Sequence, residues 1–90
     1  GVRGPAFIWT NRLSRPGRIF KKKMHIVDWL PTLVELAAEN KSSLPARLDG
    51  MSLWRSMNNN QSTTRRVVVH NIDVLVGYGS VTVDNWKIVN

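Results

Sequence analysis

The chain has 90 residues and no cysteine, which excludes disulfide bonds, a thiolate nucleophile and cysteine-based metal sites within it. No apolar run approaches the roughly 18 residues that a membrane-spanning helix needs, so we expect no membrane span. The net charge of +7 attracts phosphate backbones and anionic surfaces, unless acidic partners lie in sequence outside these residues. Both ends interrupt apolar or structured patterns, and we therefore expect a piece of a longer protein.

The first predicted element is a strand at residues 6–9, Ala-Phe-Ile-Trp. Such a short apolar run is typical of a strand that is buried on both faces of a parallel sheet. Residues 10–23 are polar and basic and are predicted to form a surface loop. Within this loop, Pro16 followed by Gly17 favours a type II turn, because Gly accepts the positive φ that this turn requires.

The clearest helix is predicted over residues 28–38, with Asp28 as its N-cap and Pro31 in the first turn, where a missing N–H does little harm. An apolar stripe at i, i+3, i+4 and i+7 marks the face that we expect to be buried. The stripe consists of Leu30, Leu33, Val34 and Ala37. His25 borders the start of this helix, where a packed and hydrogen-bonded histidine is the common outcome.

After a connector at 40–50, a short helical turn is predicted within residues 51–57, followed by an exposed polar loop at 58–66. The remaining residues, 67–90, read as strands. β-Branched residues predict a strand at 67–73, Gly77 to Gly79 predict a turn, and a hairpin turning at Asp84 and Asn85 is expected to close the sheet. The predicted class is α/β, or α+β for these residues alone.

Residues that could carry hydrolytic or metal chemistry are few. His25 and His70 lie in no nucleophile motif, and the six carboxylates are scattered without a ligand spacing, so we assign no catalytic and no metal residue. Two Asn-x-Ser sequons, at Asn40 and Asn60, are candidate N-glycosylation sites in predicted loops. The basic residues between 12 and 23 lie near aromatic side chains but carry no nucleic-acid-binding signature.

Five segments of the chain resemble arylsulfatases, and they occur in the order found in that family. They are residues 1–8 (Gly-Val-Arg-Gly-Pro-Ala-Phe-Ile), 25–37 (with Asp-Trp-Leu-Pro-Thr-Leu), 48–54, 69–73 (Val-His-Asn-Ile-Asp) and 85–89 (Asn-Trp-Lys-Ile-Val). The His-Asn-Ile-Asp segment is similar to the N-acetylgalactosamine-4-sulfatase branch, which is arylsulfatase B-like and includes the I and J relatives. The chain departs from the branch at Val74, Thr82 and Asp84, where Pro, Arg and Gly are usual, and residues 74–86 look shortened.

The resemblance implies a parent with the alkaline-phosphatase-like sulfatase fold. Residues 1–57 would end its large α/β domain, 58–66 would form a loop, and 67–90 would begin its small antiparallel-sheet domain. It also implies hydrolysis of sulfate esters, including those of glycosaminoglycans, in a lysosomal or secreted glycoprotein. The family uses calcium, a formylglycine, and Lys and His groups that would precede Gly1, so no catalytic residue carries over. Arg3 is a hypothetical rim residue of that active site, with packing at a strand end as the alternative.

Three hypotheses follow from these observations. The leading one is an arylsulfatase B-like segment that is inactive alone and whose partner is the remainder of the sulfatase chain, which binds a sulfated small molecule or glycan and no nucleic acid. The alternative is a small basic binding module for nucleic acid or sulfated glycans. The third is a truncated natural product that acts as a non-catalytic partner protein.

Overall fold

The computed structural model describes residues 4–38, 44–59 and 65–90, which form two compact units. The helical unit comprises the described residues of 11–65, and the sheet unit comprises those of 1–10 and 66–90. Helices and an antiparallel sheet in one chain confirm the α+β expectation. No helix in the described ranges is both long enough and apolar enough to cross a bilayer.

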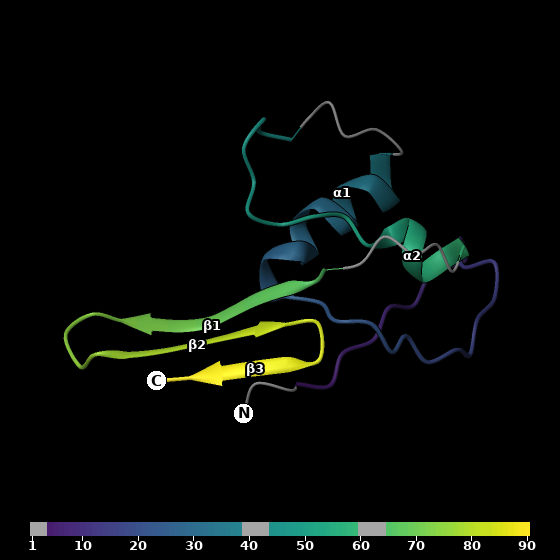
Figure 1. Ribbon diagram of the computed structural model, residues 1–90. Coiled ribbons are helices and arrows are strands. Elements are labelled where there is room, and N and C mark those ends of the chain that lie inside the picture. Colours follow the sequence, from purple (N-terminus) through teal and green to yellow (C-terminus); the bar gives the residue numbers. More distant parts are fainter. Residues whose placement is uncertain (1–3, 39–43, 60–64) are drawn as a thin grey trace. The chain divides into compact units, whose positions relative to one another are not determined.

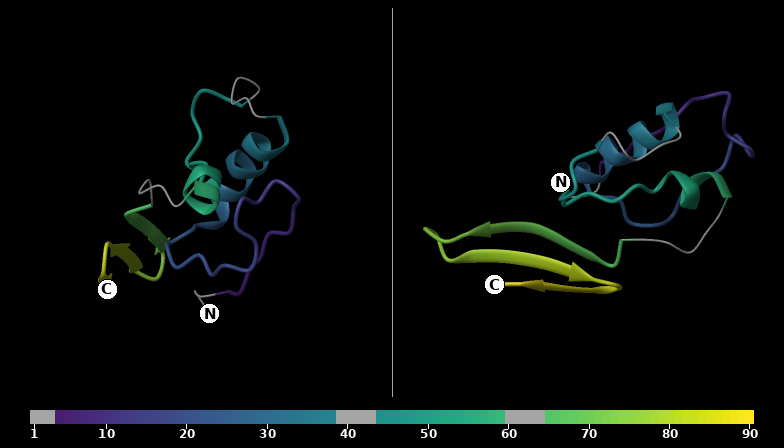
Figure 2. Two further views of the ribbon diagram at one scale, coloured as in Figure 1. Left: turned by 90° about the vertical axis from the view of Figure 1, so that its right-hand side faces the viewer. Right: turned by 90° about the horizontal axis from the view of Figure 1, so that it is seen from above.

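The helical unit contains a 3-10 turn, η1 (Ile26–Asp28), and the helices α1 (Trp29–Ala38) and α2 (Trp54–Asn59). α2 packs against α1, as the two views of Figure 2 show. The loop before η1 is irregular, as predicted, and Gly17 has a φ of 82°. The predicted short helix exists, but it starts at Trp54, because Met51 and Leu53 use their backbone N–H groups in long-range hydrogen bonds instead.

The prediction that Asp28 is the N-cap was wrong. His25 is the N-cap of η1: its Nδ1 accepts a hydrogen bond from the Val27 N–H at 3.3 Å, and the Asp28 carboxylate accepts one from the His25 N–H at 2.9 Å. This reciprocal arrangement is a capping box, which satisfies N–H groups that a helix start leaves without partners. The segment 25–27 is thus part of an extra turn that directly precedes α1.

The face of α1 that is buried differs from the predicted one. Leu30 and Leu33 of the apolar stripe are 55% and 45% exposed, whereas Asp28, Thr32 and Glu35 are buried. The latter three repeat at i, i+4 and i+7 and therefore share one face of the helix. Within this chain the helix buries its hydrogen-bonding face, because the loop before α2 and the side chains of Arg65 and Arg55 bind to it.

The sheet unit is a three-stranded antiparallel sheet in the order β1 (Val67–Asp73), β2 (Tyr78–Val83) and β3 (Trp86–Val89), as Figure 1 shows. The predicted hairpin at Asp84 and Asn85 is confirmed, and Asp84 has a φ of 50° in its turn. The first turn spans residues 74–77, so β2 begins one residue after Gly77. The expectation of a turn as far as Gly79 was therefore wrong, because Gly79 pairs with Ile72 of β1.

The strand register places apolar side chains together on one face of the sheet. Val67, Val83 and Trp86 lie opposite one another across the three strands, and so do Val69, Val81 and Ile88. A bulge between Val69 and Asn71 shifts the register, which puts Ile72 on this same face. We call these residues the apolar sheet face: Val67, Val69, Ile72, Val81, Val83, Trp86 and Ile88.

The prediction of a strand at residues 6–9 was wrong for this structure. Residues 4–10 have no regular secondary structure, and the side chains of Phe7 and Trp9 are each 88% exposed. A strand buried on both faces needs hydrogen-bonded neighbours and two covering layers. The described residues supply one sheet, which is antiparallel and built from β1, β2 and β3.

Candidate functional site

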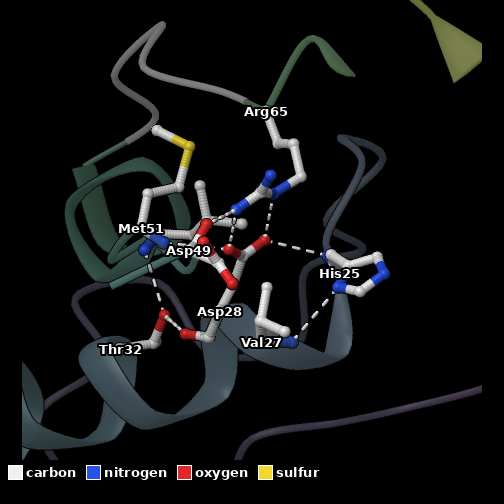
Figure 3. Close-up of polar contacts among 8 residues, drawn as sticks. His25, Val27, Asp28, Thr32, Asp49, Met51 and Arg65 are labelled. Carbon is white, nitrogen blue, oxygen red and sulfur yellow. Dashed lines mark hydrogen bonds and ion pairs between the residues drawn. The ribbon is translucent and has the colours of Figure 1, made fainter. Parts of the chain in front are cut away.

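The carboxylate of Asp28, a residue with no exposed surface, accepts four hydrogen bonds from described residues of the helical unit. Arg65 binds this carboxylate through two donors: its Nε donates to Oδ2 at 2.8 Å, and its Nη2 donates to Oδ1. Figure 3 shows the guanidinium facing the carboxylate, with the His25 main chain approaching from another side. A two-pronged Arg–carboxylate pair of this kind fixes geometry as well as adding energy.

Main-chain donors complete the shell around Asp28. The Met51 N–H donates to Oδ1 at 2.9 Å, and the His25 N–H donates to Oδ2 at 2.9 Å. Arg65 also donates to the backbone oxygen of Asp49 at 2.8 Å, so the same guanidinium holds the loop that presents Met51. We call Asp28, Arg65 and these main-chain groups the Asp28 cluster.

Thr32 extends the cluster by one helical turn. Its hydroxyl donates to the backbone oxygen of Asp28 at 2.6 Å and accepts a hydrogen bond from the Leu53 N–H at 3.0 Å. Leu53 is fully buried and forms the apolar core of this unit directly beside that bond. A buried hydroxyl is thereby satisfied both as a donor and as an acceptor, as burial requires.

Gly50 is required where the loop crosses the first turn. A Cβ at this position would lie 1.9 Å from the backbone oxygen of Val27 and 2.7 Å from its carbonyl carbon. No side chain fits at such distances, so only glycine lets the loop approach closely enough for Met51 to reach Asp28. Gly50, which lies in the predicted connector at 40–50, thus allows the loop to approach the backbone of Val27 closely.

The charges of the cluster stabilise each other. Burial alone raises the pKa of Asp28, but the hydrogen bonds from Arg65, Met51 and His25 outweigh burial and hold that pKa below its ordinary value of 3.8. The hydrogen bond to Asp28 in turn raises the pKa of Arg65. Both groups are therefore ionised at neutral pH, as a buried pair must be if it is not to leave an uncompensated charge.

This arrangement does not fit acid–base or metal chemistry. Both carboxylate oxygens of Asp28 accept two hydrogen bonds each from protein donors, and the residue has no contact with solvent. The described residues contain no group of three metal-ligating side chains of the His, Cys, Asp and Glu types. The Asp28 cluster is a structural link between α1, the loop before α2 and Arg65.

A second set of hydrogen bonds joins the basic loop, residues 10–23, to the C-terminal ends of α1 and α2. Arg12 donates to the Leu36 carbonyl in the last turn of α1, and Arg18 donates to the Met57 carbonyl of α2. Ser14 binds Asn58 through its N–H and its hydroxyl, each at 2.8 Å from Asn58 Oδ1. Cationic donors at helix C-termini satisfy free carbonyls and oppose the negative end of the helix dipole. These arginines therefore have a structural role in addition to their charge.

The side of this loop that faces α2 is hollowed. The hollow has a volume of about 430 Å³ and is lined by Ser14, Arg15, Arg18, Asn58 and Asn59. It is polar, it lies within the helical unit, and it is separate from the Asp28 cluster in its residues.

The residues singled out from the sequence have different outcomes. Arg3, Asn40 and Asn60 lie outside the described residues, so the rim and glycosylation hypotheses stay predictions. His25 is a helix cap, and His70 lies with its Nε2 2.6 Å from Thr82 Oγ1 across β1 and β2. The sequence analysis missed the Asp28–Arg65 pair, and nothing in the local pattern indicates it, since the two residues are 37 positions apart.

Comparison with known proteins identifies a protein whose sequence is similar to this chain. No protein-family model matches the chain. The chain is 29% identical to mouse arylsulfatase J over 106 residues, a match that takes in 98% of this chain and 18% of the relative. The chain thus spans less than a fifth of the length of that relative, and the matched stretch is longer than the chain's own 90 residues. This similarity supports a relationship with the sulfatase family.

Proposed function

We propose that this chain is a structural segment of a sulfate ester hydrolase of the arylsulfatase B-like branch, which includes the I and J relatives. The observation that carries the proposal is the match to arylsulfatase J along nearly the whole chain. The five family-like segments, which occur in family order, lie within this match.

The proposed role of the segment is scaffolding. Its best-organised polar groups, those of the Asp28 cluster, bind one another and leave no oxygen of Asp28 for a substrate or a metal. The described residues hold no group of three His, Cys, Asp or Glu side chains. We propose that the calcium and the formylglycine of the parent are held by other parts of the longer protein, and that the chain alone is inactive.

The proposed substrates are sulfate esters, including those of glycosaminoglycans, and the proposed location is the lysosome or the cell exterior. Both rest on the relationship with the sulfatases. The alternative of a small basic binding module gains no support from the arginines of the loop, because Arg12 and Arg18 are bound to helix ends. A steep salt dependence of specific DNA binding by this chain would favour that alternative.

Two experiments test the proposal. The first reads the gene upstream of Gly1, where we expect an in-frame Cys-x-Pro-x-Arg motif that supplies the formylglycine. The second replaces the matched stretch of mouse arylsulfatase J by this chain and measures hydrolysis of an aryl sulfate. We expect activity from the chimera and none from the 90-residue chain, with or without calcium. An upstream reading frame without the motif, or hydrolysis by the pure chain, contradicts the proposal.

A further inference from the structure

We propose that the basic loop docks on the surface of a lipid bilayer that carries anionic headgroups. This interaction goes beyond the role of the segment in a sulfatase and does not depend on that role. Residues 11–23 hold six lysine and arginine side chains and no carboxylate. Clusters of about 4–8 such cations next to a bilayer are attracted by its acidic phospholipids.

The positive charge of the loop is not neutralised by nearby carboxylates. The side chains of Arg15, Lys21 and Lys22 are exposed, and no hydrogen bond or ion pair joins them to a described residue. The two carboxylates that follow the loop most closely in the sequence, those of Asp28 and Glu35, are buried and paired with arginines. Exposed cations of this kind can bind an anionic surface without giving up an existing partner.

An exposed apolar side chain lies among these cations. Ile19, which the sequence places between Arg18 and Lys21, is 82% exposed. Segments that bind membrane surfaces combine the same two kinds of side chain. Their cations bind the headgroups, and their apolar side chains enter the boundary between the headgroups and the acyl chains. The loop therefore offers both an electrostatic and an apolar contact to a bilayer.

The helical unit holds this part of the loop at both of its ends. On the N-terminal side, Arg18 donates a hydrogen bond to the Met57 carbonyl of α2. On the C-terminal side, His25 forms the capping box of η1. Residues 19–22 thus lie between two fixed points, which reduces the conformational entropy that the loop loses when it docks.

The same residues favour a bilayer over a nucleic acid. Both partners are polyanions and attract the exposed cations of the loop. Proteins that bind single-stranded nucleic acids also stack aromatic side chains on the bases, but Phe20, the aromatic residue of this loop, is half-buried. Ile19 is aliphatic and cannot stack on a base in this way, whereas the headgroup boundary of a bilayer can bury it.

The test is flotation of lipid vesicles with the full 90-residue chain, in which bound protein rises with the vesicles and aggregated protein sinks. We expect binding to vesicles of phosphatidylcholine and phosphatidylserine in a ratio of roughly 2:1, and none to pure phosphatidylcholine. Raising the salt from about 0.1 M to about 1 M shortens the screening length from about 10 Å to about 3 Å. We expect this change to weaken binding by about tenfold or more.

The electrostatic contact is tested by removing one cation at a time. Lys21→Gln is expected to weaken binding by about fivefold, the contribution of one cation at an anionic surface. Lys22→Gln repeats the test at a second exposed position. Arg47→Gln is the matched control, since it removes an exposed charge outside the loop, and it is expected to change binding by less than about twofold.

The apolar contact is tested by Ile19→Ser. We expect this variant to bind about tenfold more weakly, because burial of a large aliphatic side chain is lost. Leu75→Ser is the matched control: Leu75 is 95% exposed and belongs to the sheet unit. It is expected to leave binding to the anionic vesicles unchanged.

Equal binding to neutral and anionic vesicles would overturn the proposal. Equal losses from a loop variant and its control would also overturn it, because net charge or general apolar adsorption would then explain the binding. A short DNA duplex is the second probe. Tighter binding to the duplex than to the anionic vesicles, with no effect of Ile19→Ser on either, would assign the loop to nucleic acid instead.

Discussion

Arg65 holds both carboxylate oxygens of Asp28, a residue 37 positions earlier in the chain, and also binds the backbone oxygen of Asp49. One guanidinium thus joins the start of the first helix, the loop before the second helix and the end of the helical unit. Its partner has no exposed surface and Arg65 itself is 17% exposed, so solvent screens the pair only slightly. This link connects three described parts of the helical unit that are far apart in the sequence.

We expect Asp28→Asn to destabilise the chain by about 3 kcal/mol, the typical cost of removing one partner from a buried ion pair. The substitution leaves the Arg65 charge without its counter-ion. Urea unfolding followed by circular dichroism measures the change. Asp84→Asn is the matched control, since it removes the carboxylate of the exposed pair with Arg66 and leaves a side chain that tolerates the positive φ at that position. A loss in the control equal to that in Asp28→Asn would show that burial does not set the strength of the Asp28 pair.

The contribution of Asp28 is expected to persist in mildly acidic solution. The pKa of this carboxyl in the folded chain is below its ordinary value of 3.8, so folding favours the ionised form. The stabilisation is therefore fully present above about pH 5 and is lost as the pH falls through the folded pKa, below 3.8.

The corresponding measurement is the difference in unfolding free energy between the wild type and Asp28→Asn as a function of pH. We expect this difference to be constant between pH 5 and 8 and to shrink below about pH 4. A difference that already falls between pH 7 and 5 would contradict a depressed pKa at Asp28.

Gly50→Ala is expected to disturb the same cluster from the side of the loop. The added Cβ would meet the Val27 backbone at 1.9 Å, so the loop must move away and the Met51 N–H loses its contact with Asp28. We expect a loss of at least about 2 kcal/mol, in the range for overpacked sites plus a broken buried hydrogen bond. Gly4→Ala adds a methyl group where nothing lies within 4 Å and is the control, and a similar loss there would refute the close-approach explanation.

The sequence predicted the elements that depend on local patterns. A β-branched run located β1, the hairpin turn at Asp84 and Asn85 located the start of β3, and the proline-bearing apolar segment located α1. Each of these signals depends only on residues that are close together in the sequence. The positive φ of Gly17 followed from turn chemistry in the same way.

The sequence did not predict which face of α1 is buried. Periodicity marks an apolar stripe, but the partner that covers a face is set by residues far along the chain, here Arg65 and the loop at Met51. The chain matches 18% of its relative, and under the proposed function its hydrophobic pattern also reflects the longer protein. The incorrect prediction of a strand at residues 6–9 has the same cause. A buried strand needs neighbouring strands and covering layers, which the described residues do not supply for this segment.

The apolar sheet face leads to a last prediction, about solubility. Six of its seven residues are exposed, among them Trp86 at 80%, Ile72 at 69% and Ile88 at 65%. An apolar patch of this kind drives association unless another part of a protein covers it. We therefore expect the 90-residue chain to bind hydrophobic dyes and to aggregate with increasing concentration.

Ile88→Thr keeps a β-branched side chain in β3 while reducing the patch, so we expect weaker dye binding and a higher concentration at which aggregation begins. Val89→Thr makes a similar change one residue later, on the opposite face, where Ser80 and Asn71 are its cross-strand neighbours. Light scattering of the two variants at equal concentration separates the two faces. If Val89→Thr suppresses aggregation as strongly as Ile88→Thr does, the association is not a property of the apolar sheet face but of exposed strand residues in general.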